Sequence, residues 1–271
     1  MCLIFVAHDC HADYRLILAS NRDEFYARPT APAAFWEDQV GLFGGRDLEQ
    51  GGAWLAVNRT GRFAAITNYR DPAEFERKGL SRGLLLKNLL TDPKPVREFF
   101  SDLQTADVAG SAYNAYNVLG GDLHESGELH WHSNKAPKQI PTRLVPGVYG
   151  LSNHLLDTPW PKVVSGRTAF AQIVLNESQP KPAQLWHQNP EPFFEVLADR
   201  TLAPDAALPD TGIGIDKERF LSSRFISSEV YGTRASSLLF VLRSGLVVFY
   251  ERRFTAGGVP AGESRHEFHL R

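Results

Sequence analysis

Short apolar runs on either side of polar turns dominate the first part of the sequence. Residues 3–7 (Leu-Ile-Phe-Val-Ala) and residues 14–19 (Tyr-Arg-Leu-Ile-Leu-Ala) flank a polar stretch at residues 8–13, a pattern typical of a β-hairpin. The apolar positions are nearly continuous rather than alternating, which is expected for strands that are covered on both faces. The sequence therefore predicts two adjacent buried strands at the start of the chain.

Further short apolar runs predict mostly antiparallel strand pairs. Residues 58–61 (Asn-Arg-Thr-Gly) and 243–245 (Arg-Ser-Gly) supply turn chemistry between two of these pairs. His130 and His132 share one face of a strand and are interpreted as part of an exposed edge. The glycine pairs at 44–45, 51–52, 120–121 and 257–258 are interpreted as turns. Strands are predicted at residues 53–57, 62–67, 117–120, 128–132, 236–242, 246–251 and 266–270.

Helical periodicity occurs in two blocks between the hairpins. Ser81 is a candidate N-cap for a first helix, and Pro95 begins a second. Thr158 and Pro159, an N-cap followed by proline in the first turn, open the second block. The positions expected to pack inward are Leu84, Leu85, Leu89, Leu90, Val96, Phe99, Phe100 and Leu103 in the first block, and Val164, Thr168, Ala171 and Leu175, with Val163, Phe170 and Val174 alongside, in the second. A shorter helix is expected to hold Phe193, Phe194 and Leu197.

The order of these elements indicates the fold class. Hairpins outnumber strand–helix–strand units and the helices come in pairs, which favours stacked antiparallel sheets with helix layers outside over a doubly wound parallel sheet. Residues 176–189, with Pro180 and Pro182, form the best linker candidate, but they lie too late to divide the chain. The sequence therefore predicts a single α+β domain over residues 1–271.

Composition and charge exclude several classes of protein. The 271 residues are 43% hydrophobic and 22% charged with a formal net charge of −2, which excludes a disordered or collagen-like chain. No Lys/Arg cluster stands out, so nucleic acid is not an expected partner. Only Cys2 and Cys10 occur, which excludes a disulfide framework and favours a reducing compartment. The apolar run at residues 3–7 is too short for a signal peptide or a membrane span, so we expect a cytoplasmic protein without a transmembrane segment.

Common cofactor and metal motifs are missing from the sequence. It contains no GxGxxG after a strand, no GxxxxGKS/T, no HExxH, no CxxC and no GxSxG. His8, Cys10 and His11 superficially resemble a metal cluster, but neighbours in a tight turn do not converge easily on one tetrahedral ion. We therefore expect no metal site and no required cofactor.

Cys2 and the polar residues after the second predicted strand are the remaining candidates for chemistry. If residues 8–13 form the turn, opposed positions in the ladder sum to about 21 or 22, which places Cys2 beside residues 19–20. Arg22 and Asp23 then leave the sheet close to the Cys2 sulfur. An arginine beside a cysteine favours the thiolate, which is the nucleophilic form.

The position of Cys2 suggests how its thiol loses a proton. A small residue at position two usually allows removal of Met1, which would give Cys2 a free α-amine with a pKa near ~8. That amine can accept the thiol proton, so that one residue supplies both nucleophile and base. The alternative interpretation of Cys2 is a small buried apolar residue at a strand start. Residues 21–24 are alternatively a solvated turn capped by Asn21.

Several short motifs that span nearly the whole chain resemble those of one family. They are Met1-Cys2, Asn21-Arg22-Asp23-Glu24-Phe25, Gly51-Gly52-Ala53-Trp54-Leu55, Thr67-Asn68-Tyr69, Tyr149-Gly150-Leu151-Ser152-Asn153 and Tyr231-Gly232-Thr233-Arg234. In these motifs the sequence is similar to the NRDE-motif family, the transport and Golgi organization protein 2 family. The resemblance implies the four-layer αββα fold of N-terminal-nucleophile hydrolases. It also implies an intracellular role linked to haem trafficking and acyl-CoA binding, without a settled reaction.

Cysteine-type members of that wider fold, the bile-salt hydrolases and penicillin acylases, imply roles for matching positions. By this resemblance Cys2 is the nucleophile, Arg22 tunes its thiol and Asp23 orients the α-amine. Asn68 or Asn153 donates to an oxyanion, and a late arginine binds an anionic group. The expected catalytic residues are Cys2, Arg22, Asp23, Asn68, Asn153 and Arg234, and the expected ligand-binding residues are Asn21, Arg22, Asp23, Glu24, Trp54 and Arg234.

Three functions are compatible with these residues. The first is a trafficking protein that holds haem, as cargo, or an acyl-CoA-like ligand in a pocket near Cys2, with one of the nine histidines as a haem ligand. The alternative is a cysteine amidohydrolase that cleaves a small amide or thioester. A third option is a partner-binding module without a small ligand. We expect the first, because the resembling family has no established reaction.

Overall fold

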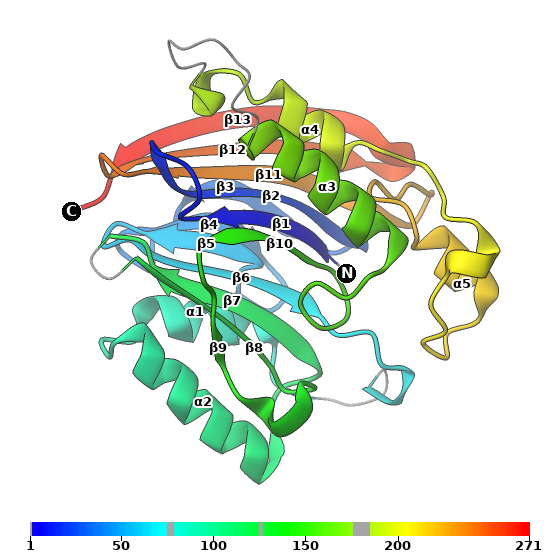
Figure 1. The fold of residues 1–271 in the computed structure, drawn as a ribbon, viewed down its shortest axis with the longest axis horizontal. Helices are drawn as coiled ribbons and strands as arrows, with labels where there is room; N and C mark the ends of the chain where they lie inside the picture. The colour runs from blue at the N-terminus through cyan, green and yellow to red at the C-terminus, as the bar shows by residue number, and fades with distance from the viewer. Residues whose placement is uncertain (1, 75–78, 125–126, 176–184) are drawn as a thin grey trace.

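The computed structural model describes residues 2–74, 79–124, 127–175 and 185–271. Two antiparallel sheets stack face to face between pairs of helices (Figure 1). One sheet has six strands in the order β10 (Gly147–Leu151), β1 (Cys2–His8), β2 (Tyr14–Phe25), β11 (Tyr231–Leu242), β12 (Leu246–Thr255) and β13 (Val259–His269). The other has seven strands in the order β3 (Thr30–Phe35), β4 (Leu42–Asp47), β5 (Leu55–Asn58), β6 (Arg62–Asn68), β7 (Tyr116–Asp122), β8 (Glu128–Ser133) and β9 (Thr142–Arg143).

Helices cover the outer face of each sheet. The seven-stranded sheet is covered by α1 (Arg82–Thr91) and α2 (Val96–Gly110), and the six-stranded sheet by α3 (Pro161–Leu175) and α4 (Glu191–Leu197). A further short helix, α5 (Ile215–Phe220), lies in the connection that leads to β11. Short 3-10 turns lie at Pro72–Glu74, Pro137–Gln139, Trp186–Gln188, Asp205–Ala207 and Ala256–Gly258. The predicted four-layer αββα arrangement is confirmed.

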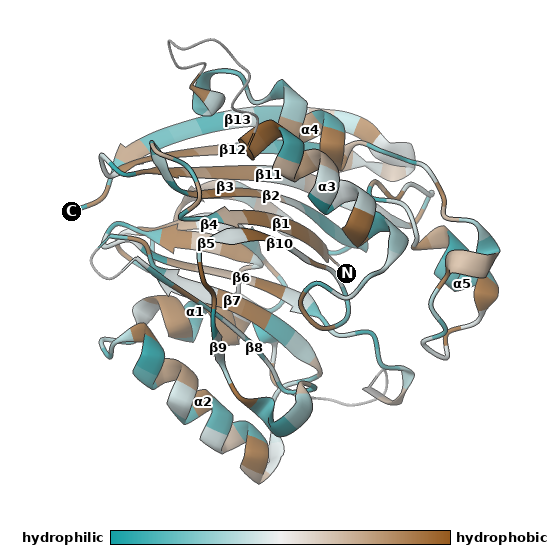
Figure 2. Ribbon diagram, in the orientation of Figure 1, coloured by the Kyte–Doolittle hydropathy of each residue, from teal (hydrophilic) through white to brown (hydrophobic). Residues whose placement is uncertain are grey.

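Strand β1 shows why the first hairpin is apolar at nearly every position. Ile4 and Val6 point between the two sheets, into one core cluster, whereas Leu3 and Phe5 point toward α3 and α4, into the other. Both faces of the strand are therefore removed from water, as predicted. In Figure 2 the central strands are coloured as hydrophobic and the edge strand β13 is largely hydrophilic, in line with its mostly exposed residues.

The predicted hairpins at β1–β2, β5–β6, β7–β8 and β11–β12 are confirmed, but two glycine pairs were interpreted wrongly. Gly44 and Gly45 lie within β4, and Gly120 and Gly121 within β7. A Cβ atom on Gly44 would lie 2.5 Å from the carbonyl oxygen of Leu55. These glycines therefore allow close approach of the neighbouring backbone. The strands β3, β4, β9 and β10 were not predicted.

Three further expectations, two about side-chain exposure and one about a helix start, are wrong. His132 is 0% exposed and His130 is buried, because α2 covers the face of β8 that carries them. Strand β8 is also not an edge strand, because β9 pairs with it. Helix α3 begins at Pro161 rather than at Thr158. Its inward positions include Val163, Phe170 and Val174, whereas the Val164 stripe faces outward.

No helix in the described part of the chain is long and apolar enough to cross a membrane. Residues 176–184, most of the predicted linker, lie outside the described residues, and residues 185–189 lead directly into α4.

Candidate active site

The register of the first hairpin places Cys2 directly opposite Arg22. The strands are joined by residues 9–13, close to the predicted turn, but the ladder runs from Cys2–Arg22 to His8–Leu16, so opposed positions sum to 24 and not to 21 or 22. The prediction that Cys2 lies beside residues 19–20 is therefore wrong. Polar residues 21–24 also remain in β2 instead of leaving the sheet, because β11 pairs with this part of β2 on its other side.

Strand alternation sends the two key side chains of β2 to opposite faces. Cys2 and Arg22 are directly opposed in the ladder, so both side chains point between the sheets. Asp23 is one position further and hydrogen-bonds with Thr233 on the face toward the helices. All three residues nevertheless border one cleft at the end of the hairpin. The structure thus places the three residues at one end of the hairpin, with the Asp23 carboxylate on the opposite face of the sheet from the Cys2 sulfur and the Arg22 guanidinium.

The cleft has a volume of about 220 Å³ and is predominantly polar. Its walls come from the end of the β1–β2 hairpin, from the loop between β4 and β5, and from the start of α1. It is lined by Cys2, Arg22, Asp23, Glu24, Arg28, Asp47, Gln50, Ala53, Trp54, Ile66, Asn68, Gly79, Leu80, Ser81, Arg82, Gly83 and Asn114. Three arginines and three carboxylates in this wall suit a strongly polar or charged group.

Arg22 is fixed by contacts on several sides. Its Nη1 donates to Thr30 Oγ1 at 3.0 Å, its guanidinium carbon lies 4.2 Å from the centre of the Trp54 ring, and Nη2 is 3.9 Å from Asp47 Oδ2. Asp47 in turn accepts from Arg28 Nε at 2.8 Å. The Arg22 side chain is therefore fixed in the cleft wall, and the residue is only 5% exposed.

Asp23 is buried on the far side of the same strand. Its Oδ1 accepts from Thr233 Oγ1 at 2.8 Å, and its main-chain oxygen accepts from the Tyr231 hydroxyl at 3.2 Å. Burial raises the pKa of Asp23, and the Thr233 hydrogen bond and the charge of Lys162 act in the opposite direction. The carboxylate is therefore held in place by partners that stabilise its charged form.

The Cys2 side chain is half-buried at the cleft wall. Burial raises the pKa of its thiol, as does the charge of Asp23, while the charge of Arg22 lowers it. The raised pKa favours the protonated thiol at neutral pH, so attack by this sulfur requires a nearby base.

The other predicted residues divide into two groups. Asn68, Glu24 and Trp54 line the cleft with Cys2. In the described part of the chain, the cleft lining does not include Asn21, Asn153 or Arg234. The side chains of these three residues instead donate hydrogen bonds to main-chain oxygens.

The Nδ2 of Asn21 donates to the main-chain oxygens of Leu197, at the end of α4, and Arg224 at 2.9 and 2.8 Å. Asn21 therefore ties β2 to the segments that cover the outer face of its sheet. Asn153 donates to the main-chain oxygen of Asn68 at 3.0 Å and so positions that strand end. Arg234 occupies an irregularity in β11, and its Nη1 donates to the main-chain oxygens of Phe25, the last residue of β2, and of Arg28. These positions support the cleft from outside it.

Comparison with known proteins identifies the family. The model of the family described as Transport and Golgi organisation 2 matches residues 1–256. The chain belongs to this family. The Transport and Golgi organization protein 2 homolog of Bos taurus is 35% identical over 286 residues, covering 100% of this chain and 99% of the relative. The Transport and Golgi organization protein 2 of Drosophila melanogaster is 29% identical, covering 97% and 95%.

A solved structure shows the fold of this Transport and Golgi organisation 2 family member. The C2A mutant of a conjugated bile acid hydrolase from Clostridium perfringens aligns with a TM-score of 0.54, covering 100% of this chain and 92% of that one. At 9% sequence identity this likeness concerns the fold alone, which is the N-terminal-nucleophile hydrolase fold. The resemblance and the fold class expected from the sequence are confirmed.

Sequence reasoning missed several residues near the cleft of this family member. Gln50, Arg82 and Asn114 line it, and Lys162 and Tyr231 lie behind it. Tyr231 belongs to the Tyr231-Gly232-Thr233-Arg234 motif, so the family resemblance already pointed to this position. Lys162 gives no signal in the sequence, because a lysine in the first turn of a helix is ordinarily exposed.

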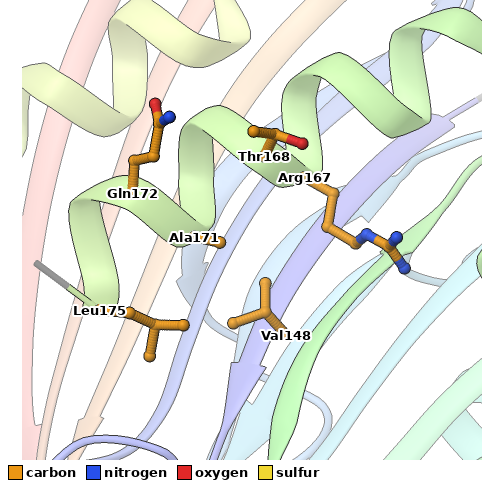
Figure 3. A pocket seen from close by; sticks show the side chains of 6 residues that line it. All are labelled: Val148, Arg167, Thr168, Ala171, Gln172 and Leu175. Carbon is orange, nitrogen blue, oxygen red and sulfur yellow. The ribbon is translucent and has the colours of Figure 1, made fainter.

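A wider hollow of about 770 Å³ lies elsewhere, between α3 and the edge strand β10 (Figure 3). It is lined by Val148, Arg167, Thr168, Ala171, Gln172 and Leu175. Among the described residues it shares no lining side chain with the Cys2 cleft. Size alone therefore does not identify the site, because no cysteine is among the described residues that line the wider hollow.

Proposed function

We propose that this protein is a cysteine hydrolase that cleaves a small amide or thioester, with Cys2 as the nucleophile after removal of Met1. The observation that carries this proposal is the common cleft of Cys2, Arg22 and Asp23. A half-buried thiol with a raised pKa is a weak nucleophile unless a base lies beside it. The α-amine that removal of Met1 would create on Cys2 is such a base, and Asp23, at the same end of the hairpin, would orient it.

The chemistry follows from these groups. The Cys2 sulfur attacks the carbonyl carbon of the substrate, and the thiol proton passes to the α-amine. The leaving amine or thiol takes that proton as its bond to the carbonyl carbon breaks, which leaves an acyl thioester on Cys2. Water then hydrolyses the thioester, releases the acid and restores the thiol. Asn68 in the cleft wall is a candidate donor to the oxyanion.

The size of the cleft limits the substrate. Its volume of about 220 Å³ lies below the range of about 300–1,000 Å³ typical of pockets that enclose whole drug-sized ligands. The cleft therefore accepts a short acyl group or the reacting end of a longer molecule.

The test combines mass measurement with kinetics. Intact mass shows whether Met1 is absent, and hydrolysis of a series of short acyl amides and acyl thioesters is then measured. We expect hydrolysis by the wild type and by Cys10→Ser, which removes the other thiol, and none by Cys2→Ala. Equal rates in wild type and Cys2→Ala, or no hydrolysis by protein that lacks Met1, would overturn the proposal.

A second function is binding of an anionic cargo in trafficking, as the names of the relatives suggest. Arg22, Arg28 and Arg82 line the cleft, and arginines suit the carboxylates of haem or the phosphates of an acyl-CoA. Given the cleft volume, only the end of such a ligand enters. Haem titration at the Soret band and acyl-CoA calorimetry test this role, with Arg22→Met as the weakened variant. The absence of both a spectral shift and heat of binding at micromolar protein would refute this role.

A further inference from the structure

Arg22 has hydrogen-bond donors that no other described residue uses. Its side chain lines the cleft and is 6% exposed. Nη1 donates to Thr30 Oγ1 at 3.0 Å, but Nη2 lies 3.9 Å from Asp47 Oδ2, which is too far for a hydrogen bond. Within residues 2–74, 79–124, 127–175 and 185–271, neither Nη2 nor Nε has a hydrogen-bond acceptor. A guanidinium that is more than nine-tenths buried therefore keeps two nitrogens without a partner in this part of the chain.

The carboxylates that border the cleft are bound by other groups. Asp47 Oδ1 accepts from the main-chain nitrogens two and three residues further along at 3.0 and 3.2 Å, and its Oδ2 accepts from Arg28 Nε at 2.8 Å. Glu24 Oε2 lies 3.9 Å from the same Arg28 Nε. Asp23 is hydrogen-bonded on the opposite face of the sheet. The Arg22 charge therefore lacks a carboxylate in hydrogen-bond contact among the described residues.

The packing of Trp54 leaves the unused donors of Arg22 available. The indole covers the flat face of the guanidinium, whose carbon lies 4.2 Å from the ring centre. The N–H bonds of a guanidinium lie in its plane, so they can donate past the stacked ring. Nε and Nη2 are neighbours on one edge of that plane, and two parallel N–H bonds on one edge match the two oxygens of a carboxylate. Burial lowers the pKa of Arg22, and the charges of Glu24 and Asp47 offset this lowering only in part.

We propose that Arg22 forms a carboxylate subsite, and that the substrate of Cys2 carries a carboxylate a few bonds from the carbonyl carbon that the sulfur attacks. Cys2 and Arg22 are directly opposed in the ladder and point between the sheets. The Cβ atoms of such a pair lie about 4.5–5.5 Å apart. The cleft that both residues line has a volume of about 220 Å³, so one small molecule reaches both groups.

The inference rests on the proposed function for the reaction at Cys2, but the subsite itself is measurable without turnover. The direct test compares alkylation by iodoacetate and by iodoacetamide, which differ in charge. In both reactions the Cys2 thiolate forms a bond to the CH₂ carbon and displaces iodide. Because both reagents need the same thiolate, the ratio of their rates cancels any effect of Arg22 on the pKa of the thiol.

Cys10 is the reference thiol in the same molecule. We expect the ratio of iodoacetate to iodoacetamide rates to be about tenfold higher at Cys2 than at Cys10, the scale of one charge-assisted hydrogen bond. Arg22→Met should lower the Cys2 ratio several-fold, and Arg22→Lys, which keeps the charge, should lower it less. Arg167→Met, in the wider hollow beside α3, is the control and should leave the ratio unchanged. A wild-type ratio at Cys2 no higher than that at Cys10, or an unchanged ratio in Arg22→Met, would overturn the inference.

Turnover then shows on which side of the scissile bond the carboxylate lies. A succinyl thioester carries it in the acyl group, and the acetyl thioester of thioglycolate carries it in the leaving group. Butyryl and acetyl thioesters of ethanethiol are the neutral counterparts. We expect one carboxylate to raise kcat/KM about tenfold in wild type but not in Arg22→Met. Equal hydrolysis of charged and neutral thioesters would overturn the inference and leave the proposed function intact. A raised alkylation ratio without any hydrolysis would instead overturn the proposed function and support the subsite.

Discussion

Two buried polar clusters of this protein contain side chains that are common in enzymes, but they differ in access. Beneath α2, Asp107 Oδ2 accepts from the Tyr116 hydroxyl at 2.5 Å and lies 2.8 Å from His132 Nε2. Tyr116 and His132 are 0% exposed. At the end of the first hairpin, Cys2 and Arg22 instead line a cleft.

The difference between the clusters lies in what surrounds them. The Asp107 cluster joins α2 to β7 and β8, so its hydrogen bonds stabilise the contact between helix and sheet. The Cys2 cleft lies where the strands end and three segments of chain leave a space between them. Residue types alone therefore do not identify an active site, because a reaction also needs access for a substrate. The first cluster therefore stabilises the fold, and the proposed reaction belongs to the second.

The largest expected effect is on turnover. Cys2→Ala should abolish the proposed hydrolysis, a loss of about 10⁴-fold or more, because the nucleophile is gone. Asp107→Ala should leave the rate of the folded enzyme unchanged. Steady-state kinetics at a temperature where both variants are folded checks this contrast. Loss of turnover in folded Asp107→Ala would show that the two clusters are not separate in function.

The second effect concerns stability and is expected in the other cluster. Asp107→Ala leaves the Tyr116 hydroxyl and the His132 ring without their buried acceptor, which should lower the free energy of unfolding by about 3 kcal/mol. Cys2→Ala should change it by less than about 1 kcal/mol, since the half-buried thiol lies at a strand end. Urea unfolding of both variants measures the difference. Equal destabilisation would contradict the separate roles.

A smaller effect, of opposite sign, is expected at Asp23. Because burial raises the pKa of Asp23, its charged form is unfavourable in the folded protein at neutral pH. Asp23→Asn keeps an acceptor for Thr233 and should raise the free energy of unfolding by about 1 kcal/mol at pH 7. The same variant should lose turnover. A marked loss of stability would show that the Asp23 charge serves the fold.

The smallest effect is the pH dependence of the two carboxylates. Burial alone would raise the pKa of Asp107, but hydrogen bonds from His132 and Tyr116 hold it below its usual value. Its contribution to stability is therefore present above about pH 4 and is lost as the pH falls further. The unfavourable contribution of the Asp23 charge should instead be relieved on acidification.

Urea unfolding of Asp107→Ala, Asp23→Asn and wild type at several pH values between 3 and 7 would separate these signs. The loss of unfolding free energy in Asp107→Ala should shrink at low pH, and so should the gain in unfolding free energy in Asp23→Asn. If both differences stayed constant across this range, the assigned directions would be wrong.

The sequence predicted the layers of the fold because burial leaves a periodic signal. The β1–β2 hairpin and the Ser81 helix start both follow from local patterns, and both are confirmed. Strand β4 was missed because Gly44 and Gly45 resemble a turn locally. Their presence in a strand reflects the close approach of Leu55 and Trp54, which the local pattern does not encode.

The candidate site was predictable in part, because local patterns in the sequence predict the hairpin that carries it. The pairing of Cys2 with the Arg22 region follows from hairpin geometry, although the register was wrong by about two positions. Lys162 was not predictable, because its burial depends on the packing of α3 against a connection more than fifty residues further along the chain. Asn153 and Arg234 matched the family motifs, yet their bonds support the cleft from outside.

The most direct test of Cys2 as the reacting group is to trap the acyl intermediate. Protein that lacks Met1 is mixed with a short-chain acyl thioester, quenched in acid and digested with trypsin. Cys2 and Cys10 fall on one peptide that ends at Arg15, so fragment ions assign the added acyl mass. We predict the acyl group at Cys2 and an unmodified Cys10. Product release with no acyl mass on this peptide, or with the acyl group only on Cys10, would contradict the role of Cys2.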